Sequence, residues 1–493
     1  MKKLDIGVIV TTLIIVTISC SLAFFAARVV GEPKDINLVA KNVAITFNDT
    51  SIIANGVVSP GWSATKTFTI KNDTKTEYKY NIVIKDLVNT FVTNGYLQYK
   101  ITTTNGGYNM TEFKDIPKSS APKDTILAYS VVIPNGVTQS YTIEFKYTND
   151  ESVDQSDDMG KKLSGTLFIT EGTEDPNKTL LTQLLVDKST KLTRTDFSKV
   201  LTNDNTNTLY TSTEDSKTVY YFAGNAADNW VKFGKNESNQ DLYWRIIRTN
   251  SDGSVRLLYH GTSTTATDAY IRTTVFNSSA DNIAYVSYMF GSTGSISNAR
   301  ENTNNSTIKT TIDNWYTSNL EAKDYTKYLS TTAVYCNDRS TSNNSEFGAY
   351  TRVGANKTPT YDCATTEDKF TVDTSTGNGK LTYPIALMTA DEVSFAGGLW
   401  WTNAPTWYYY NSANGSSTGS TWWWLLSPYG WIGSYAGVFN VFGSSNPGYL
   451  GNNSVSYTGG VRPALSLKSC VKYSRGDGSA SDPYTIKETE TGC

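Results

Sequence analysis

The chain has few of the residues that carry most enzymatic and metal chemistry. Its 493 residues include a single histidine, His260, five cysteines and five methionines. The sequence contains no CxxC spacing for a metal, and no phosphate-binding loop, dinucleotide fingerprint or Ser-His-Asp pattern. The net charge of −3 gives no basic footprint for nucleic acid. We therefore expect no enzymatic activity, no cofactor or metal, and no nucleic-acid partner.

Charge is missing altogether from one long segment. Residues 393–461 contain no Asp, Glu, Lys, Arg or His, although charged residues make up 18% of the chain. Tyr, Gly, Ser, Asn and Trp fill the segment instead. Antibody loops use the same residues, because rigid amphipathic rings give contact area and small residues give fit. Charged side chains would have to be desolvated against a partner, so their absence favours a binding surface.

The first 30 residues predict a membrane anchor. Residues 6–27 are uncharged and long enough to cross a bilayer as a helix, and Lys2 and Lys3 favour an N-terminus inside the cell. Two alternatives stay open, a signal peptide cleaved near "FFAARVV" and a lipidated Cys20. All three place the bulk of the chain outside the cell. We interpret residues 1–30 as the cytoplasmic tail and transmembrane signal anchor of a single-pass membrane protein.

The four cysteines beyond Cys20 predict disulfide bonds. An even number of cysteines in an exported chain favours pairing, and four cysteines allow three connectivities. Proximity in the sequence favours Cys336 with Cys363 and Cys470 with Cys493. Because no histidine lies near them, a metal site is not expected.

Residues 36–172 predict an all-β antiparallel sandwich. Apolar and polar residues alternate in short runs separated by Gly, Pro and Asn: "NVAITF", "KTFTIKN", "YKYNIVI", "ILAYSVVIP", "SYTIEFKY" and "GTLFIT". This period of two buries one face of each strand and leaves the other in water. The acidic segment with Pro and Asn that follows, residues 173–179, predicts a linker.

Residues 180–490 predict an α+β domain with long Ser/Thr/Asn loops. Apolar residues at helical spacing in "KTLLTQLLVDK" and "NSTIKTTIDNWYTSNL" predict two helices. A third helix begins with a capping box of Thr389 and Glu392 and ends at Gly397. "LYWRIIRTNSDGSVRLLYHG" predicts two strands around a turn. "RGDGSASD", residues 475–482, lacks the EF-hand spacing for calcium, so a hairpin turn is preferred.

Part of the N-terminal half resembles a known family. The apolar segment is followed by "VSPGWSATKTFTIKND" and later by "DQSDDMGKKLSGTLFITEG". These segments resemble the exported β-sandwich family of camelysin and related biofilm-fibre proteins of Gram-positive bacteria. The resemblance implies an extracellular spacer or fibre subunit without a catalytic site.

The C-terminal half resembles a second family. Along the chain follow "LYWRIIRTNSDGSVRLLYHG", "YCNDRS", "MTADEVSFAGG", "WWWLLSPYG", "GGVRPALSLKS" and "GDGSASDPYTI". In combination they resemble a surface-domain family of Gram-positive gut bacteria with a C-type-lectin-like fold. Some of its members are variable proteins of diversity-generating retroelements. The resemblance covers residues 178–490 and implies a ligand-binding domain whose gene segment is diversified by reverse transcription with errors at template adenines.

This second resemblance implies a variable region at residues 429–459. Template codons AAC or AAT become codons that end in a pyrimidine, and such codons cannot encode Lys, Glu, Gln, Met or Trp. Positions interleaved with apolar residues here hold only residues that such codons encode. These candidate ligand-binding residues are Tyr429, Gly430, Ile432, Tyr435, Gly437, Phe442, Tyr449, Gly451, Asn452, Asn453, Ser454, Ser456, Tyr457 and Gly459.

The residues between these positions predict a buried scaffold. Tyrosines suit recognition because each ring buries a large area while it freezes few torsions, so we expect the candidates to be exposed and clustered. The expected buried scaffold is Trp423, Leu425, Ala436, Val438, Val441 and Leu450. Tryptophan is highly buried on average, so core positions are also expected for Trp400, Trp401, Trp422 and Trp424. Structural roles are expected for Arg462, which ends the uncharged run, and for His260.

We therefore expect a cell-surface display or adhesion protein. Its parts are an N-terminal transmembrane helix, an all-β sandwich stalk and a C-terminal α+β C-type-lectin-like domain that binds an unknown extracellular protein or glycan. Two other functions stay open. The sandwich resemblance allows a structural biofilm-matrix or pilus-like subunit, and the aromatic residues allow a glycan-binding lectin of fixed specificity.

Overall fold

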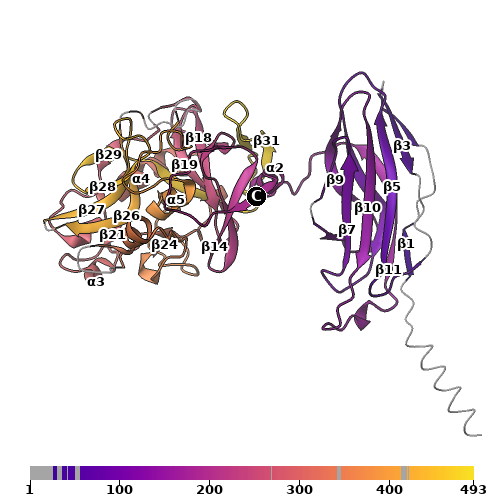
Figure 1. Cartoon of the computed structure of the whole chain (residues 1–493), viewed down its shortest axis with the longest axis horizontal. Coiled ribbons are helices and arrows are strands. Elements are labelled where there is room, and N and C mark those ends of the chain that lie inside the picture. Colours follow the sequence, from indigo (N-terminus) through magenta and orange to yellow (C-terminus); the bar gives the residue numbers. More distant parts are fainter. Residues whose placement is uncertain are drawn as a thin grey trace, which may run out of the picture. The chain divides into compact units, whose positions relative to one another are not determined.

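The chain forms two compact units that divide after Pro176 (Figure 1). The computed structural model describes residues 26–29, 36–40, 43–49, 56–110, 112–267, 269–340, 346–411, 419, 421–432 and 434–493. We call the part up to Pro176 unit 1 and the part from Asn177 unit 2. The division lies within residues 173–179, where the sequence predicts a linker.

Unit 1 consists of two β-sheets around one core. The first sheet has the order β4 (Gly56–Val57), β1 (Ala26–Val29), β11 (Lys162–Glu171), β6 (Tyr78–Asn89) and β9 (Ser119–Ile133). The second has the order β2 (Ile36–Ala40), β3 (Val43–Asp49), β5 (Ser63–Asn72), β10 (Thr138–Tyr147), β7 (Leu97–Thr104) and β8 (Lys114–Asp115). A short helix, η1 (Ser156–Asp158), precedes β11. Alternate residues such as Phe68, Ile70 and Ile143 are buried in the core, as a period of two requires. The predicted antiparallel sheets are confirmed, and β1 with β11 is a parallel pair among them.

The start of unit 1 corrects the predicted membrane span at one end. Ala26 and Ala27, the last two residues of that span, lie in β1, where they pair with Lys162 and Leu163 of β11. Backbone hydrogen bonds to a neighbouring strand exclude these two residues from a helix. The sandwich therefore begins at residue 26 and not at 36, and residues 1–25 lie outside the described part of the chain. Within the residues that are described, no helix is long and apolar enough to span a membrane.

Unit 2 contains a ten-stranded sheet. Its main path runs β12 (Thr190–Thr193), β14 (Thr208–Glu214), β15 (Lys217–Tyr221), β18 (Asp241–Thr249), β17 (Trp230–Lys235), β32 (Tyr484–Ile486) and β31 (Tyr473–Arg475). A branch leads from β18 to β19 (Val255–Gly261), β30 (Pro463–Leu467) and β25 (Ile385–Leu387). The β18–β19 pair confirms the predicted strands around the turn at residues 250–253, and β31 pairs with β32 across the turn predicted at residues 475–482.

A five-stranded sheet carries most of the candidate variable region. Its order is β20 (Thr273–Val275), β29 (Thr458–Gly460), β26 (Trp423–Ile432), β27 (Tyr435–Val441) and β28 (Leu450–Ser454). Two-stranded sheets join β13 (Asp204–Asn205) to β16 (Asn225–Ala226), β21 (Met289–Phe290) to β22 (Asn304–Asn305), and β23 (Tyr335–Cys336) to β24 (Lys369–Phe370). One hydrophobic core includes residues of both large sheets, for example Leu257 and Val438. Figure 1 shows β26, β27 and β28 next to one another within unit 2.

The three predicted helices of unit 2 are confirmed. They are α2 (Leu180–Asp187), α4 (Thr307–Tyr316) and α5 (Ala390–Ala396). The side chain of Thr389 accepts from the N–H of Glu392 and the Glu392 side chain accepts from the N–H of Thr389, which is the predicted capping box. Gly397 ends α5 at φ 117°, a left-handed angle that favours glycine. The remaining helical segments are η2 (Ile283–Val286), α3 (Ile296–Ala299), η3 (Thr317–Glu321), η4 (Thr326–Tyr328), η5 (Tyr350–Asn356) and η6 (Thr366–Asp368).

Both predicted disulfide bonds are present. Cys336 pairs with Cys363 at a Cα–Cα distance of 5.7 Å, and Cys470 pairs with Cys493 at 5.2 Å. Both pairs lie in unit 2. The first connects β23 to the segment before η6, and the second fixes the C-terminal residue to the chain after β30.

Replacing Cys336 and Cys363 together by serine should lower the free energy of unfolding by about 3 kcal/mol. The bond closes a loop with a sequence separation of 27, and cross-linking such a loop removes that much chain entropy from the unfolded state. Denaturant titration measures the loss, and Cys20→Ser serves as the control, with no change expected. Free thiols at both positions in a digest of the unreduced protein would contradict the pairing.

Candidate binding face of unit 2

The scaffold that the sequence predicts for the variable region is buried as expected. Trp423, Leu425, Ala436, Val438, Val441 and Leu450 all have no exposed surface. They belong to the hydrophobic core of unit 2. Because β27 is the central strand between β26 and β28, its apolar residues pack on the core throughout their length.

The candidate ligand-binding residues fall into three groups by exposure. Ser456 and Tyr457 are exposed, and Tyr457 exposes 60% of its surface. Half-buried are Tyr429, Tyr435, Phe442, Tyr449, Asn452 and Asn453. Buried are Gly430, Gly437, Gly451, Ser454 and Gly459. The side chain of Ile432 lies outside the described part of the structure. The expectation that all candidates are exposed is therefore wrong for the buried group, because those residues sit inside the paired strands β26 to β29.

Three candidate residues meet at an aromatic surface. The ring of Tyr429 stacks on Trp400 with centroids 5.2 Å apart, and it contacts the edge of Tyr350 at 5.1 Å. Tyr449 packs edge-on against Trp401 at 5.3 Å. Phe442 contacts Tyr449 at 5.4 Å in the same way. We call Tyr350, Trp400, Trp401, Tyr429, Phe442 and Tyr449 the aromatic face.

Trp401 is the most exposed residue of the aromatic face. It exposes 63% of its surface, so its expected core position is wrong. Its backbone has φ 54°, a left-handed angle that is uncommon for any residue with a side chain and costs free energy. Its N–H donates to the Leu450 carbonyl at 3.1 Å, which holds this conformation against the edge of β28. The turn therefore presents the indole ring of Trp401 to water beside Tyr449.

Of the other four tryptophans of the series, two occupy the predicted core positions and two do not. Trp423 and Trp424 are completely buried. Trp422 and Trp400 are half-buried and pack on the core from outside. The physical reason for the difference from Trp401 is position, since Trp423 and Trp424 lie within β26, whereas Trp401 lies in the turn beyond α5.

The phenols of Tyr429 and Tyr449 in the aromatic face are uncharged at neutral pH. Burial, and then the neighbouring Tyr350, Glu346 and Tyr435, raise the pKa of Tyr429 to about 12. Burial also raises the pKa of Tyr449 above its ordinary value. Both phenols therefore keep their protons and can donate hydrogen bonds. The rings can stack on apolar or planar groups of a ligand, and the phenols can hydrogen-bond at the rim of the face.

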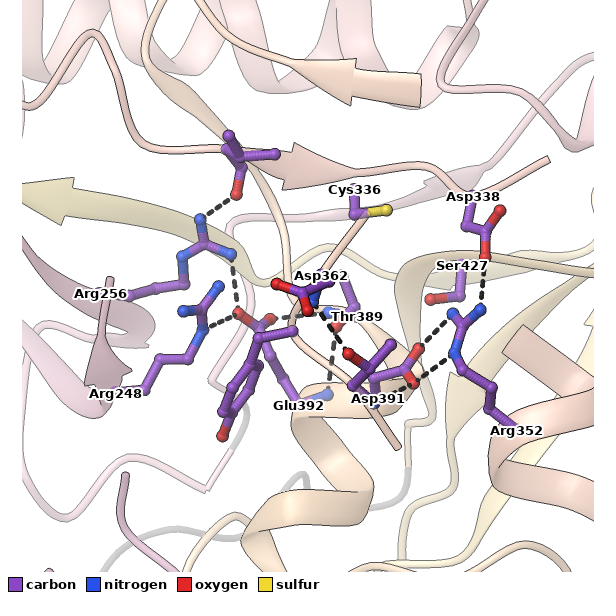
Figure 2. A pocket seen from close by; sticks show the side chains of 13 residues that line it. Arg248, Arg256, Cys336, Asp338, Arg352, Asp362, Thr389, Asp391, Glu392 and Ser427 are labelled. Carbon is purple, nitrogen blue, oxygen red and sulfur yellow. Dashed lines mark hydrogen bonds and ion pairs between the residues drawn. The ribbon is translucent and has the colours of Figure 1, made fainter. Parts of the chain in front are cut away.

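An ionic contact beneath the face holds the segments that carry its aromatic residues. Arg352 of η5 forms two hydrogen bonds at 2.9 Å with the two carboxylate oxygens of Asp391, and its Nη1 donates to Asp338 at 2.6 Å (Figure 2). Burial by itself lowers the pKa of Arg352, but the charges of Asp391 and Asp338 raise it above its usual value. Tyr350 starts η5, and α5, which contains Asp391, leads within a few residues to Trp400. Arg352 therefore fixes two parts of the aromatic face to each other.

A second buried ionic group lies next to the first. Glu392 Oε1 accepts from Arg248 Nε at 2.8 Å and from Arg256 Nη1 at 2.7 Å (Figure 2). Arg248 also donates to Glu214 at 2.8 Å. All four side chains are nearly without solvent contact. Burial by itself raises the pKa of Glu392, but Arg256 and Arg248 outweigh it and hold the pKa below its usual value. Glu392 is therefore the shared counter-ion of two strands, β18 and β19.

The cavity between these ionic groups is too small for an organic ligand. Its volume is about 10 Å³, which is room for one water molecule. Cys336 lines it but is held in the disulfide bond. No cluster of three or more His, Cys, Asp or Glu side chains in the described ranges could hold a metal ion. The buried ionic groups thus support the aromatic face and do not form a site of their own.

His260 and Arg462 lie in the interior, as expected of structural residues. Both are completely buried. His260 Nε2 lies 3.1 Å from the Ala266 carbonyl, and Arg462 Nε donates to the Tyr259 carbonyl at 3.2 Å.

The sequence reasoning missed Tyr350 and the exposure of Trp401. Tyr350 lies 79 positions before Tyr429 in the printed sequence and in a segment without strand or helix periodicity. A signal for Trp401 was present, because it follows the Gly397–Gly398 pair that ends α5, and residues after a helix stop lie in turns at the surface. Tyr457 and Ser456, conversely, lie in the turn between β28 and β29, and no ring contact joins Tyr457 to the face within the described residues.

Comparison with known proteins gives no relative from which a function follows. No family model matches this chain, and no curated protein is similar enough to match it. A solved structure described as "AvmM Catalyzes Macrocyclization in Alchivemycin A Biosynthesis" is similar to 30% of this chain and 97% of its own, with 12% identity and a TM-score of 0.17. A likeness at that score carries no argument about fold or function.

Proposed function

We propose that the protein is a cell-surface display protein that binds an extracellular ligand through the aromatic face of unit 2. In this proposal residues 6–25 anchor the chain in the membrane, unit 1 is a stalk, and unit 2 is the C-type-lectin-like binding domain. The predicted anchor, the two cysteine pairs and the uncharged segment 393–461 support an exported chain with a recognition surface. The ligand is a protein or a glycan with an apolar or planar part.

One observation carries the proposal. Trp401 holds a left-handed backbone and exposes 63% of its surface beside Tyr449, on a rigid support of β-strands and ionic contacts. Exposed aromatic rings on a rigid framework dominate binding energies at interfaces, because they bury a large area at low entropic cost. Nothing in packing alone requires an exposed indole at a strained position.

Diversification of the candidate residues is the finer part of the proposal. The gene should be flanked by a reverse-transcriptase gene and by a near-repeat of the codons for residues 425–463 that differs only at template adenines. The exposed and half-buried candidates are the positions where new side chains would reach a ligand.

A lectin of fixed specificity is the second candidate function. It is favoured by Tyr429, whose ring contacts Trp400, Tyr350 and Phe439 at 5.1 to 5.4 Å. A ring packed on three others is a poor position for free variation and a good platform for the apolar face of a sugar. Identical specificity in strains that differ at the candidate residues would favour this function.

Replacing Trp401 by glycine should weaken ligand binding at least tenfold and leave the fold intact. The full-length chain is tested on arrays of glycans and of extracellular protein domains, and the variant is compared on the ligands that the wild type binds. Glycine adopts φ 54° without strain, so the free energy of unfolding should stay within about 1 kcal/mol of the wild-type value or rise.

The matched control is Val186→Ser, since Val186 is exposed to 69% on α2, away from the five-stranded sheet. This control should bind as the wild type does. Unchanged affinity of the Trp401→Gly variant for every ligand of the wild type would refute the proposed face.

A further inference from the structure

Two of five buried arginines in unit 2 lack a carboxylate partner among the described residues. Arg248, Arg256 and Arg339 are ion-paired to carboxylates at 2.7 to 2.8 Å. Arg245 and Arg462 are as deeply buried, with no exposed surface, yet no carboxylate in the described part of the chain pairs with either. The contrast within one domain shows that this protein ordinarily neutralises its buried guanidinium groups.

Arg245 is held by neutral groups on three sides. Its Nε donates to Asn229 Oδ1 at 2.6 Å and its Nη2 donates to the Ala226 carbonyl at 2.6 Å. The guanidinium group lies over the ring of Trp230, 4.0 Å from the centroid. Arg245 Nη1 and Trp230 Nε1 are both buried donors without an acceptor in the described structure.

Arg462 repeats this arrangement on a second tryptophan. Its Nε donates to the Tyr259 carbonyl at 3.2 Å, its Nη2 lies 3.4 Å from His260 Nδ1, and its guanidinium group lies 4.8 Å from the centroid of the Trp423 ring. Arg462 Nη1 and Trp423 Nε1 are again buried donors that find no acceptor within the ranges described. Each arginine–tryptophan pair therefore has two donor nitrogens without an acceptor among the described residues, and one positive charge.

The two pairs belong to one cluster. Trp230 of the first pair contacts the ring of His260 at 4.5 Å, and His260 contacts Arg462 of the second. Burial, and to a smaller extent Arg462, lower the pKa of Arg245 to about 9, although Tyr408, Tyr409 and the more distant carboxylate of Asp228 act in the opposite direction. Burial likewise lowers the pKa of Arg462 to about 9, against the effect of Tyr409 and Tyr408. Both groups thus remain charged at neutral pH and repel each other. An uncompensated buried charge is strongly destabilising.

We propose that unit 2 binds a small inorganic anion, chloride in the cell's surroundings, at the cluster of Arg245, Arg462, Trp230 and Trp423. An anion supplies the missing negative charge and accepts from the unused N–H groups, which are all donors. The atoms concerned are closed off from solvent, so a monatomic halide fits them better than a polyatomic ion such as phosphate. The site is separate from the aromatic face and does not depend on the function proposed for it.

The test measures the thermal unfolding of the full-length chain by tryptophan fluorescence in chloride, bromide or gluconate at one ionic strength. Trp62 is the one tryptophan of unit 1 among the eleven in the sequence, so the signal reports unit 2. We expect saturable stabilisation by chloride and bromide, with a rise of roughly 5 °C when the halide reaches about one hundred times its dissociation constant. Crystals grown in bromide should show its anomalous signal within hydrogen-bonding distance of Arg245 and Arg462.

Matched tryptophan variants assign the effect to the cluster. Trp230→Phe keeps a ring under Arg245 but removes the N–H, so the dissociation constant for halide should rise about tenfold, as expected for one lost hydrogen bond to a charged group. Trp244→Phe is the control, because Trp244 Nε1 already donates to the Phe233 carbonyl at 2.9 Å. Its halide dependence should equal that of the wild type.

Two outcomes would overturn the proposal. A melting temperature that is the same in all three salts would mean that water or no molecule occupies the cluster. Asp268 lies outside the described residues and follows His260 by eight positions in the sequence. If halide stabilised only the Asp268→Asn variant and not the wild type, the counter-charge would come from the chain itself.

Discussion

Replacing Glu392 by glutamine should lower the free energy of unfolding of unit 2 by about 3–5 kcal/mol. The change removes the carboxylate that Arg248 and Arg256 share, and it leaves the buried guanidinium charge of Arg256 without a carboxylate partner. Arg248 keeps Glu214, whereas Arg256 keeps, among the residues that the structure describes, the Val334 carbonyl as its acceptor. The loss is measured by denaturant titration with tryptophan fluorescence.

The control for this variant is Glu237→Gln. Glu237 is exposed, so the same chemical change there should alter the free energy of unfolding by no more than about 0.5 kcal/mol. Equal stability of both variants would show that the ionic group does not support the fold. A loss confined to Glu392→Gln would show that it does.

The lowered pKa of Glu392 predicts how the stability of the protein changes in acid. The pKa of Glu392 is lower in the folded than in the unfolded protein, so the folded state binds fewer protons. The stabilisation is complete above the unfolded pKa of about 4.3 and is lost as the pH falls from there through the folded pKa. The wild type should therefore lose stability in this range, and Glu392→Gln should lack that part of the loss.

Local patterns predicted the elements of unit 2 well where the information lies in neighbouring residues. The capping box of Thr389 and Glu392, the stop at Gly397 and the turn at residues 250–253 each depend on a few consecutive positions, and all are present. In unit 1, β7 (Leu97–Thr104) escaped notice although its buried residues alternate, because the polar "TTT" at its end resembles a loop.

Long-range contacts could not be predicted from the same patterns. The sequence shows Glu392 as a capping residue, but its partners Arg248 and Arg256 lie 144 and 136 positions away. Likewise the alternation in β27 marks Val438 as buried, but nothing local shows that Phe439, on the opposite face, is buried by Trp400 and Tyr429. Tertiary packing covers both faces of β27. Alternation with a period of two therefore cannot distinguish residues that contact a ligand from residues of the buried scaffold.

A library that randomises the candidate variable residues should yield folded clones that vary at some positions and almost never at others. Gly459 should stay glycine, because a Cβ there would lie 2.6 Å from Cη2 of Trp422 and within overlap of the rest of that ring. Few other residues should be tolerated at Gly451, since a Cβ added there would lie 2.6 Å from Phe442 Cε2. Overpacking of this kind costs about 1–3 kcal/mol or more. Tyr457 meets no such limit.

Most of the sequence variation among folded clones should instead occur at the exposed positions. Ser456 and Tyr457 are exposed, and Asn452 and Asn453 are half-buried on β28, so most side chains at the exposed positions should change stability by no more than about 0.5 kcal/mol. The library is displayed on cells, sorted for resistance to protease and sequenced, and residue frequencies at each position are compared before and after sorting. Gly448 is the control for a position where substitution should prevent folding. It has φ 71°, and a Cβ added there would collide with the Ala404 backbone.

The outcome decides how far a diversified face can extend. Free variation at Ser456 and Tyr457, with Gly451 and Gly459 fixed, would fit a recognition surface that changes at its rim while its aromatic centre stays constant. If Gly459 varied as freely as Tyr457, the contact between Gly459 and Trp422 would be refuted. If Ser456 and Tyr457 tolerated no substitution, the exposed turn would be needed for folding, and diversification of this surface would have to be abandoned, because a variable binding site requires positions whose side chains the fold does not use.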